Sequence, residues 1–163
     1  MIGSGKRAEI LLVEDNPGDA RLAQEAFRES ERVNPIHIVR DGVAAMAFLH
    51  KEGHYKDAPR PDIILLDLNL PRKDGREVLT EIKGDADLKR IPVVILSSSC
   101  DEGDISKTYD LHANCYISKP VGLDEFLKAI RLLEAFWLGI AKLPDATPNA
   151  QQNAPGNDRR SQG

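Results

Sequence analysis

The sequence has few cysteines, few aromatic residues and no long apolar run, and these scarcities exclude several classes of protein. Its two cysteines, Cys100 and Cys115, lack the spacing of zinc ligands and have no histidine pair nearby, so we expect small buried thiols in a reducing cytosol. No run approaches the roughly 20 apolar residues that span a membrane. The start, MIGSGKRAEI, lacks the apolar core of a signal peptide. A cytoplasmic protein is therefore predicted.

The charge balance also argues against one class of partner. A net charge of -4 over 163 residues disfavours nucleic acid, because binding to phosphates usually needs a basic surface. The composition predicts one globular domain over residues 9–142. Residues 1–8 are expected to form a flexible leader. Residues 143–163 are rich in Pro, Asn, Gln and Gly and are expected to form a disordered tail.

Short apolar runs alternate with amphipathic segments along the predicted domain. Runs rich in Ile, Val and Leu predict strands at 9–13, 36–39, 62–66, 93–96 and 115–118. Helices are expected at about 17–29, 42–51, 75–83, 103–112 and 123–141, the first capped by Asn16 with Pro17 at its first position. This order predicts an α/β fold: a doubly wound, five-stranded parallel sheet with five helices on its two faces.

Polar residues follow several of the predicted strands, at the edge where such sheets bind ligands. Glu14 and Asp15 follow the first strand, Asp67 the third, Ser97 the fourth and Lys119 the fifth. Each residue has an ordinary structural interpretation, for example a helix cap for Glu14 or Asp15 and a turn for Asp67. Their shared position at the ends of separate strands favours a functional site instead.

Three carboxylates gathered at one edge repel one another unless a cation joins them. Oxygen ligands suit Mg²⁺, whereas no His or Cys lies at these strand ends to bind zinc. A carboxylate beside Mg²⁺, a hydroxyl and a lysine is suited to phosphoryl transfer, with Asp67 as the natural nucleophile.

These motifs resemble the receiver domain of two-component response regulators. The resemblance rests on VEDN (13–16), LLDLNLPRKDG (65–75), ILSSS (95–99) and YISKP (116–120), and it covers roughly residues 9–140. It implies the flavodoxin-like receiver fold with strand order 2-1-3-4-5. It also implies that Asp67 accepts a phosphoryl group from a sensor histidine kinase, so that the protein is a phosphoacceptor and not itself an enzyme.

The same resemblance implies roles for the other residues at this edge. Mg²⁺ would be held by Glu14, Asp15, Asp67 and the backbone carbonyl of Asn69. Ser97 would bind the phosphoryl group, Lys119 would pair with it, and Tyr116 would turn inward as a switch when Ser97 moves. A cis peptide between Lys119 and Pro120 is also implied, since cis bonds occur almost only before proline.

Longer segments resemble the single-domain regulators that pair with bacterial phytochromes. They are residues 50–75, residues 97–126 and the ending FWLGIAKLP. This resemblance implies a phytochrome kinase as phosphodonor. Because no output domain is expected after the predicted domain, the signal would pass by protein contacts, or the phosphoryl group would be relayed onward in a phosphorelay.

The last predicted helix carries more apolar residues than one face can bury. Leu123, Phe126, Ile130, Leu133, Trp137 and Ile140 form a stripe expected to pack on the sheet. Leu132 and Phe136 lie off this stripe, so we expect them to form a homodimer interface. In receivers, the usual dimer face is the fourth helix, fifth strand and fifth helix.

Three other functions remain open from the sequence. A Mg²⁺-dependent phosphatase with an aspartyl nucleophile usually has a second aspartate two residues later, where this chain has Asn69. A flavodoxin-like cofactor binder needs a Gly-rich phosphate loop, whereas the first turn here is the acidic EDNPGD. The third is a receiver that only docks, although all five functional positions are filled.

Overall fold

The computed structural model describes residues 8–29 and 34–144. Within these residues, five parallel strands form one sheet in the order β2-β1-β3-β4-β5, which confirms the predicted order. The strands are β1 (Ile10–Val13), β2 (Ile36–Val39), β3 (Ile63–Leu66), β4 (Val93–Ser97) and β5 (Cys115–Ser118). The helices are α1 (Pro17–Arg28), α2 (Gly42–His50), α3 (Gly75–Gly84), α4 (Glu102–Asp110) and α5 (Leu123–Glu134). A 3₁₀ turn, η2 (Gly53–Tyr55), follows α2, and a π-helical segment, η3 (Ala135–Ile140), follows α5.

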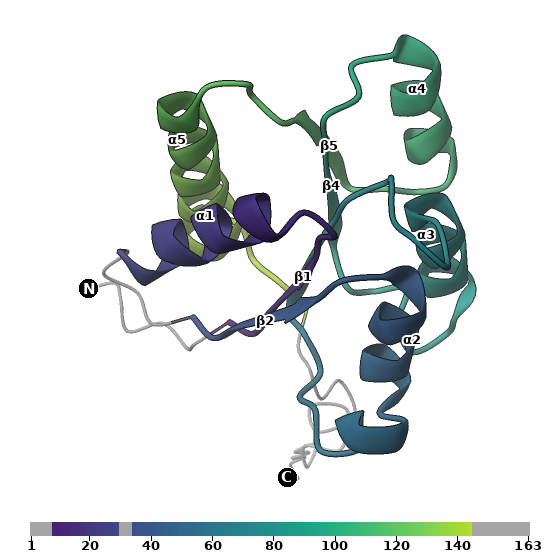
Figure 1. The fold of residues 1–163 in the computed structure, drawn as a ribbon. Coiled ribbons are helices and arrows are strands. Elements are labelled where there is room, and N and C mark those ends of the chain that lie inside the picture. The colour runs from purple at the N-terminus through teal and green to yellow at the C-terminus, as the bar shows by residue number, and fades with distance from the viewer. Residues whose placement is uncertain (1–7, 30–33, 145–163) are drawn as a thin grey trace, which may run out of the picture.

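The helices cover the sheet in two layers. Figure 1 shows α1 and α5 together on one face and α2, α3 and α4 on the other. This arrangement follows from right-handed β-α-β crossovers on either side of β1, where the strand order reverses. The place where the strand order reverses is also where such sheets bind ligands.

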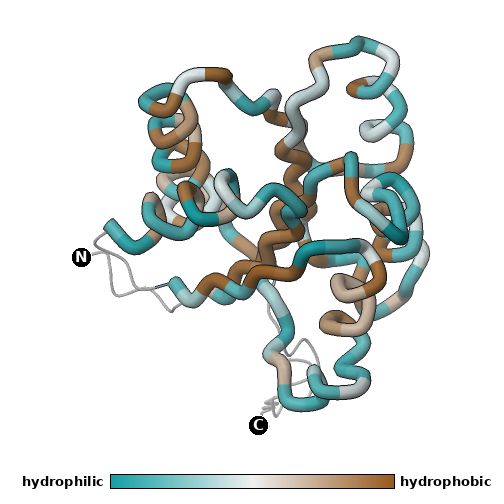
Figure 2. Tube along the Cα trace, in the orientation of Figure 1, coloured by the Kyte–Doolittle hydropathy of each residue, from teal (hydrophilic) through white to brown (hydrophobic). Residues whose placement is uncertain are grey.

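Alternate residues of the central strands belong to two separate hydrophobic cores, one on each face of the sheet. Leu11 and Val13 of β1 pack with α2 and α3, whereas Ile10 and Leu12 pack with α1 and α5. Both sets are buried because a parallel strand alternates its side chains between two covered faces. The apolar centre and the polar outer turns of the helices are visible in Figure 2.

The predicted boundaries agree with the observed elements to within a few residues. The first helix begins as expected, because the Asn16 side chain accepts a hydrogen bond from the backbone N–H of Asp19 and Pro17 is the first helical residue. The last helix differs from its predicted course: α5 ends at Glu134 and continues in the wider π-helical turn η3. The proposed leader and tail fall almost entirely in 1–7 and 145–163, outside the described residues.

Three expectations about individual residues were wrong. Among the described residues there is no cis peptide bond, so the Lys119–Pro120 bond is trans, the isomer that proline intrinsically favours by about 0.5–1 kcal/mol. Cys100 is exposed in the turn after β4, not buried as a core thiol, because the apolar strand ends before it. Leu123 is exposed at the first position of α5, before that helix packs on the sheet.

None of the described helices has the length and apolar character required to cross a membrane.

Candidate functional site

The strand ladders of the sheet extend to the functional residues and thereby set their positions. The backbone N–H of Asp67 donates to the carbonyl of Val13 at 3.0 Å. The N–H of Glu14 donates to Val39 at 3.0 Å, and the N–H of Lys119 donates to Ser97 at 2.7 Å. Each hydrogen bond continues the pairing of two strands by one step. The sheet itself therefore brings these residues to one edge.

The side chain of Lys119 lies among three carboxylates. Its Nζ is 2.6 Å from Oε1 of Glu14, 2.9 Å from Oδ2 of Asp19 and 3.5 Å from Oδ2 of Asp67. The lysine side chain is only 8% exposed. An ammonium among carboxylates at this depth offsets the repulsion between them.

Glu14 is deeply buried, whereas the neighbouring Asp15 is exposed. The residue Glu14 is 2% exposed, and burial raises the pKa of its carboxyl from 4.5 to about 7; the negative charge of Asp67 adds to this rise and the hydrogen bond from Lys119 opposes it. Burial would lower the pKa of Lys119, but hydrogen bonds to Glu14 and Asp19 outweigh it and raise that pKa. The expectation that the acidic pair lies wholly at the rim was wrong for Glu14, because its side chain is covered by Lys119 and the sheet.

The predicted metal ligands provide suitable atoms but not a ready-made site. Among the described residues, no three His, Cys, Asp or Glu side chains are arranged to hold a metal ion. Glu14 and Asp67 contact the ammonium of Lys119 instead. Their carboxylate oxygens are hard donors that fit Mg²⁺ or Mn²⁺. The site fits a divalent cation chemically, and a bound cation would compete with Lys119 for the charge of Glu14.

Asn69 and Gly75 lie against Asp67, and Ser97 ends β4, the strand beside β3. The backbone N–H of Asn69 lies 3.4 Å from Oδ1 of Asp67. Ser97, the last residue of β4, is fully buried, and its hydroxyl accepts a hydrogen bond from the N–H of Ser99 at 3.2 Å. Gly75 packs on the backbone of Asp67 so closely that a Cβ atom there would lie 2.2 Å from the Asp67 carbonyl oxygen.

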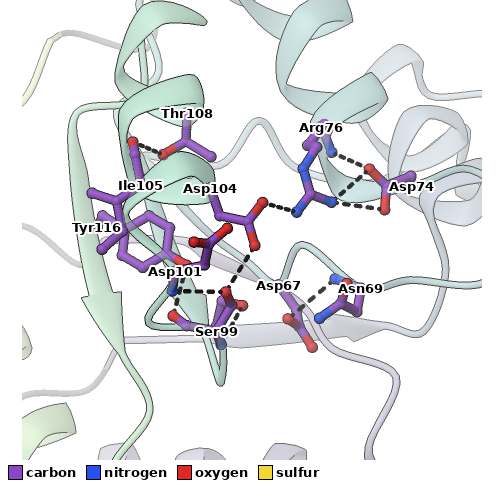
Figure 3. A network of polar contacts seen from close by, with 11 residues as sticks. Asp67, Asn69, Asp74, Arg76, Ser99, Asp101, Asp104, Ile105, Thr108 and Tyr116 are labelled. Atoms are coloured by element: carbon purple, nitrogen blue, oxygen red, sulfur yellow. Dashed lines mark hydrogen bonds and ion pairs between the residues drawn. The ribbon is translucent and has the colours of Figure 1, made fainter.

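A polar network connects the turn after β4 with α3, α4 and β5 (Figure 3). Ser99 donates its hydroxyl to Asp104 at 2.8 Å, and Arg76 donates to the other carboxylate oxygen of Asp104 at 2.9 Å. These hydrogen bonds lower the pKa of Asp104. The hydroxyl of Tyr116 donates to the carbonyl of Ser99 at 2.8 Å. Tyr116, the predicted switch residue, is therefore attached to the turn that begins at Ser97.

The sequence reasoning missed the roles of Asp19, Asp104 and Arg76. Asp19 is not among the predicted site residues, yet its carboxylate binds Lys119. Its location in the first turn of α1, which starts at the same sheet edge, was the signal that could have identified it. Asp104 and Arg76 gave no such signal, because they meet through the packing of α4 beside α3.

The apolar pair on the last helix is exposed, as predicted. Leu132 is 63% exposed and Phe136 is 51% exposed, whereas Phe126, Ile130 and Leu133 of the predicted stripe are buried. Trp137 is half-buried and meets the ring of Phe136 edge-on, with the centroids 5.5 Å apart. The side chain of Ile140 lies outside the described set.

Comparison with known families decides the class of this site. Residues 10–131 match the model of the response regulator receiver domain. The chain belongs to this family. The family is a signalling one, and the match spans the acidic residues, hydroxyl and lysine described above.

Individual relatives place the receiver near phytochrome response regulators. It is 53% identical to response regulator Rcp1 of Synechocystis over 137 residues, which cover 84% of this chain and 93% of Rcp1. The phosphorylated cyanobacterial phytochrome response regulator RcpA superposes with a TM-score of 0.84 at 55% identity, covering 86% of this chain and all of RcpA. The Mn²⁺-bound form of Rcp1 superposes with a TM-score of 0.82 at 52% identity, covering 85% of this chain and 99% of Rcp1.

Proposed function

We propose that the receiver accepts a phosphoryl group on Asp67 from a sensor histidine kinase, most specifically a phytochrome. The single observation that supports this best is the placement of the Asp67 carboxylate, 3.5 Å from the Lys119 ammonium and beside the buried Glu14. The phosphorylated state of RcpA and its description as a phytochrome regulator support both the reaction and the donor.

In this proposal the residues of the chain have separate tasks. Asp67 attacks the phosphorus in line, and the bond to the histidine nitrogen of the donor breaks as the new oxygen–phosphorus bond forms. Lys119 neutralises charge on the transferred group, and the Ser97 hydroxyl donates a hydrogen bond to it. Glu14, Asp15, Asp67 and the carbonyl of Asn69 hold Mg²⁺, which when bound withdraws negative charge from the phosphoryl oxygens.

The Mn²⁺-bound form of Rcp1 supports a divalent cation at this site, and the proposal specifies Mg²⁺ because oxygen ligands and bound phosphate suit it. The signal then passes through protein contacts, among them a homodimer through Leu132 and Phe136. Asn69 in place of a second aspartate favours a phosphoacceptor over a phosphatase, because a carboxamide does not transfer protons as a carboxylic acid does.

The decisive experiment measures intact mass after incubation with acetyl phosphate and Mg²⁺. We expect the mass of one phosphoryl group to be added to the unmodified chain and to Asp57→Asn, a variant of an exposed aspartate in the loop after α2. Asp67→Asn should gain nothing. No gain by the folded, unmodified chain would instead favour a receiver that only docks, and transfer from a phosphorylated phytochrome would test the identity of the donor.

A further inference from the structure

Asp19 binds the lysine of the site, although it belongs neither to the proposed metal ligands nor to the phosphoacceptor. Its Oδ2 lies 2.9 Å from the Lys119 ammonium, which is closer than Oδ2 of Asp67 at 3.5 Å. The ammonium therefore has two short contacts, to Glu14 and Asp19, and one long contact, to Asp67.

The proposed metal and Lys119 compete for the same carboxylate. One oxygen of Glu14 accepts Lys119 at 2.6 Å, and the other accepts the backbone N–H of Asn16 at 3.0 Å. Both oxygens already have a partner, and a divalent cation on Glu14 would be repelled by an ammonium 2.6 Å from Oε1, so binding of the metal favours withdrawal of the ammonium. A lysine that withdrew into solvent would be lost to the transferred phosphoryl group.

The carboxylate of Asp19 can hold the Lys119 ammonium when that ammonium withdraws from Glu14. Its backbone N–H is fixed by the Asn16 cap, which holds it in the first turn of α1. Its side chain is 29% exposed, so it tolerates a charge with less desolvation than the buried Glu14 does. Among the contacts of the described residues, Asp19 is the carboxylate bound to Lys119 that the metal does not require.

We propose that Asp19 is a positioning residue that keeps Lys119 at the site when a divalent cation takes Glu14. The inference rests on the proposed phosphoacceptor function and deepens it. Asp19 separates the two tasks that conflict in the present arrangement: Glu14 is released for the metal, and the ammonium remains within reach of a group on Asp67.

A double-mutant cycle on Mn²⁺ affinity tests this role in the full chain. The variants are Asp19→Asn, Lys119→Met and the double variant, with free Mn²⁺ measured by electron paramagnetic resonance. With Lys119 present, Asp19→Asn should weaken Mn²⁺ binding about threefold to tenfold, the size expected for one charge-assisted hydrogen bond. Lys119→Met should tighten binding, because the competing ammonium is gone. In that background Asp19→Asn should weaken binding at least about threefold less, since only the general loss of a negative charge remains.

The matched control is Glu25→Gln, which removes one negative charge from a half-exposed side chain of the same helix and should leave Mn²⁺ affinity unchanged. Asp19→Glu keeps the carboxylate and should restore part of the affinity that Asp19→Asn loses. Equal weakening by Asp19→Asn in both backgrounds would overturn the positioning role while leaving the metal site standing. Failure of the unmodified chain to bind Mn²⁺ would overturn the proposed metal site and this inference together.

A second measurement keeps Lys119 intact and does not depend on the folding of Lys119→Met. In ¹⁵N-labelled protein at saturating Mg²⁺, the side-chain ammonium signal of Lys119 should stay observable when Asp19 is present. It should be lost by exchange with solvent in Asp19→Asn. An ammonium signal of equal strength in both proteins would contradict the inference.

Discussion

The hydroxyl of Tyr116 donates a hydrogen bond to the backbone carbonyl of Ser99 at 2.8 Å, which joins β5 to the turn after β4. That turn directly follows Ser97, the proposed phosphoryl ligand and last residue of β4, and the ring of Tyr116 packs against the core formed with α2 and α3. In this structure the predicted switch residue is therefore in its inward, bonded position.

Replacing this hydroxyl should loosen the turn without disturbing the core. Tyr116→Phe keeps the ring and removes one partly buried hydrogen bond, so we expect the free energy of unfolding to fall by about 1 kcal/mol. Amide exchange at Ser99 and Cys100 should become faster. Denaturant unfolding and hydrogen exchange measure the two effects, and unchanged exchange in the turn would show that the bond does not hold it.

The contact between α3 and α4 should be coupled, but only weakly. Arg76 and Asp104 are 2.9 Å apart with side chains 26% and 29% exposed, so a double-mutant cycle of Arg76→Met and Asp104→Asn should give a small, favourable coupling free energy that falls as salt is added. The more exposed pair Arg28 and Glu25 is the control and should give less. Equal coupling in the two pairs would mean that the network adds nothing beyond a surface ion pair.

Close packing at Gly75 should make this position intolerant of a side chain. Gly75→Ala places a Cβ 2.2 Å from the Asp67 carbonyl oxygen, so the loop after β3 must shift, at a cost of about 1–3 kcal/mol in the free energy of unfolding. Phosphorylation by acetyl phosphate should slow as well, because Asp67 shifts with its backbone. Gly84→Ala, at the end of the same helix with open space around its Cβ, should keep both stability and rate. Normal phosphorylation of Gly75→Ala would show that the carboxylate does not depend on this packing.

The raised pKa of Glu14 predicts how stability depends on pH. The folded protein holds a proton on Glu14 up to a pKa of about 7, whereas the unfolded chain releases it near the ordinary glutamate pKa of 4.5. Between these values the native state binds more protons, so metal-free stability should fall as pH rises from about 4.5 to about 7, by at most about 3 kcal/mol. Unfolding free energies measured in chelator at pH 5 and pH 8 should show this loss in the unmodified chain and less of it in Glu14→Gln. The same pH dependence in both proteins would assign the effect to another group.

The exposed apolar pair predicts a change in oligomeric state. Leu132→Glu with Phe136→Glu places two charges on the exposed face of the last helix, where they would be buried in a dimer without partners, so the variant should sediment as a monomer. Leu127→Glu is not a suitable control because Leu127 packs against the core; Lys128→Glu, on an exposed position, changes charge without removing apolar surface. A dimer that survives the double substitution would place the interface elsewhere.

Much of the fold follows from local patterns in the sequence. The three central strands, β1, β3 and β4, are buried on both faces of the sheet, as their continuous apolar runs predict. The edge strands β2 and β5 are only half-buried, yet all five strands lie within about a residue of the predicted positions. The cap at Asn16 and the turn before Gly75 set helix starts through contacts of only a few residues. Such short-range signals survive in a single sequence because the groups that interact are also neighbours in the chain.

The sequence by itself determined which chemical groups gather at the carboxyl edge of the sheet, because strand ends in parallel order must meet there. Only the tertiary structure decided which of these charged groups are buried and which of them pair with one another. Glu14 is buried and Asp15 is exposed, and Lys119 contacts Asp19, which lies 100 residues earlier in the sequence. These outcomes depend on how α1 lies beside the end of β5, and therefore on distances and burial that no local pattern contains.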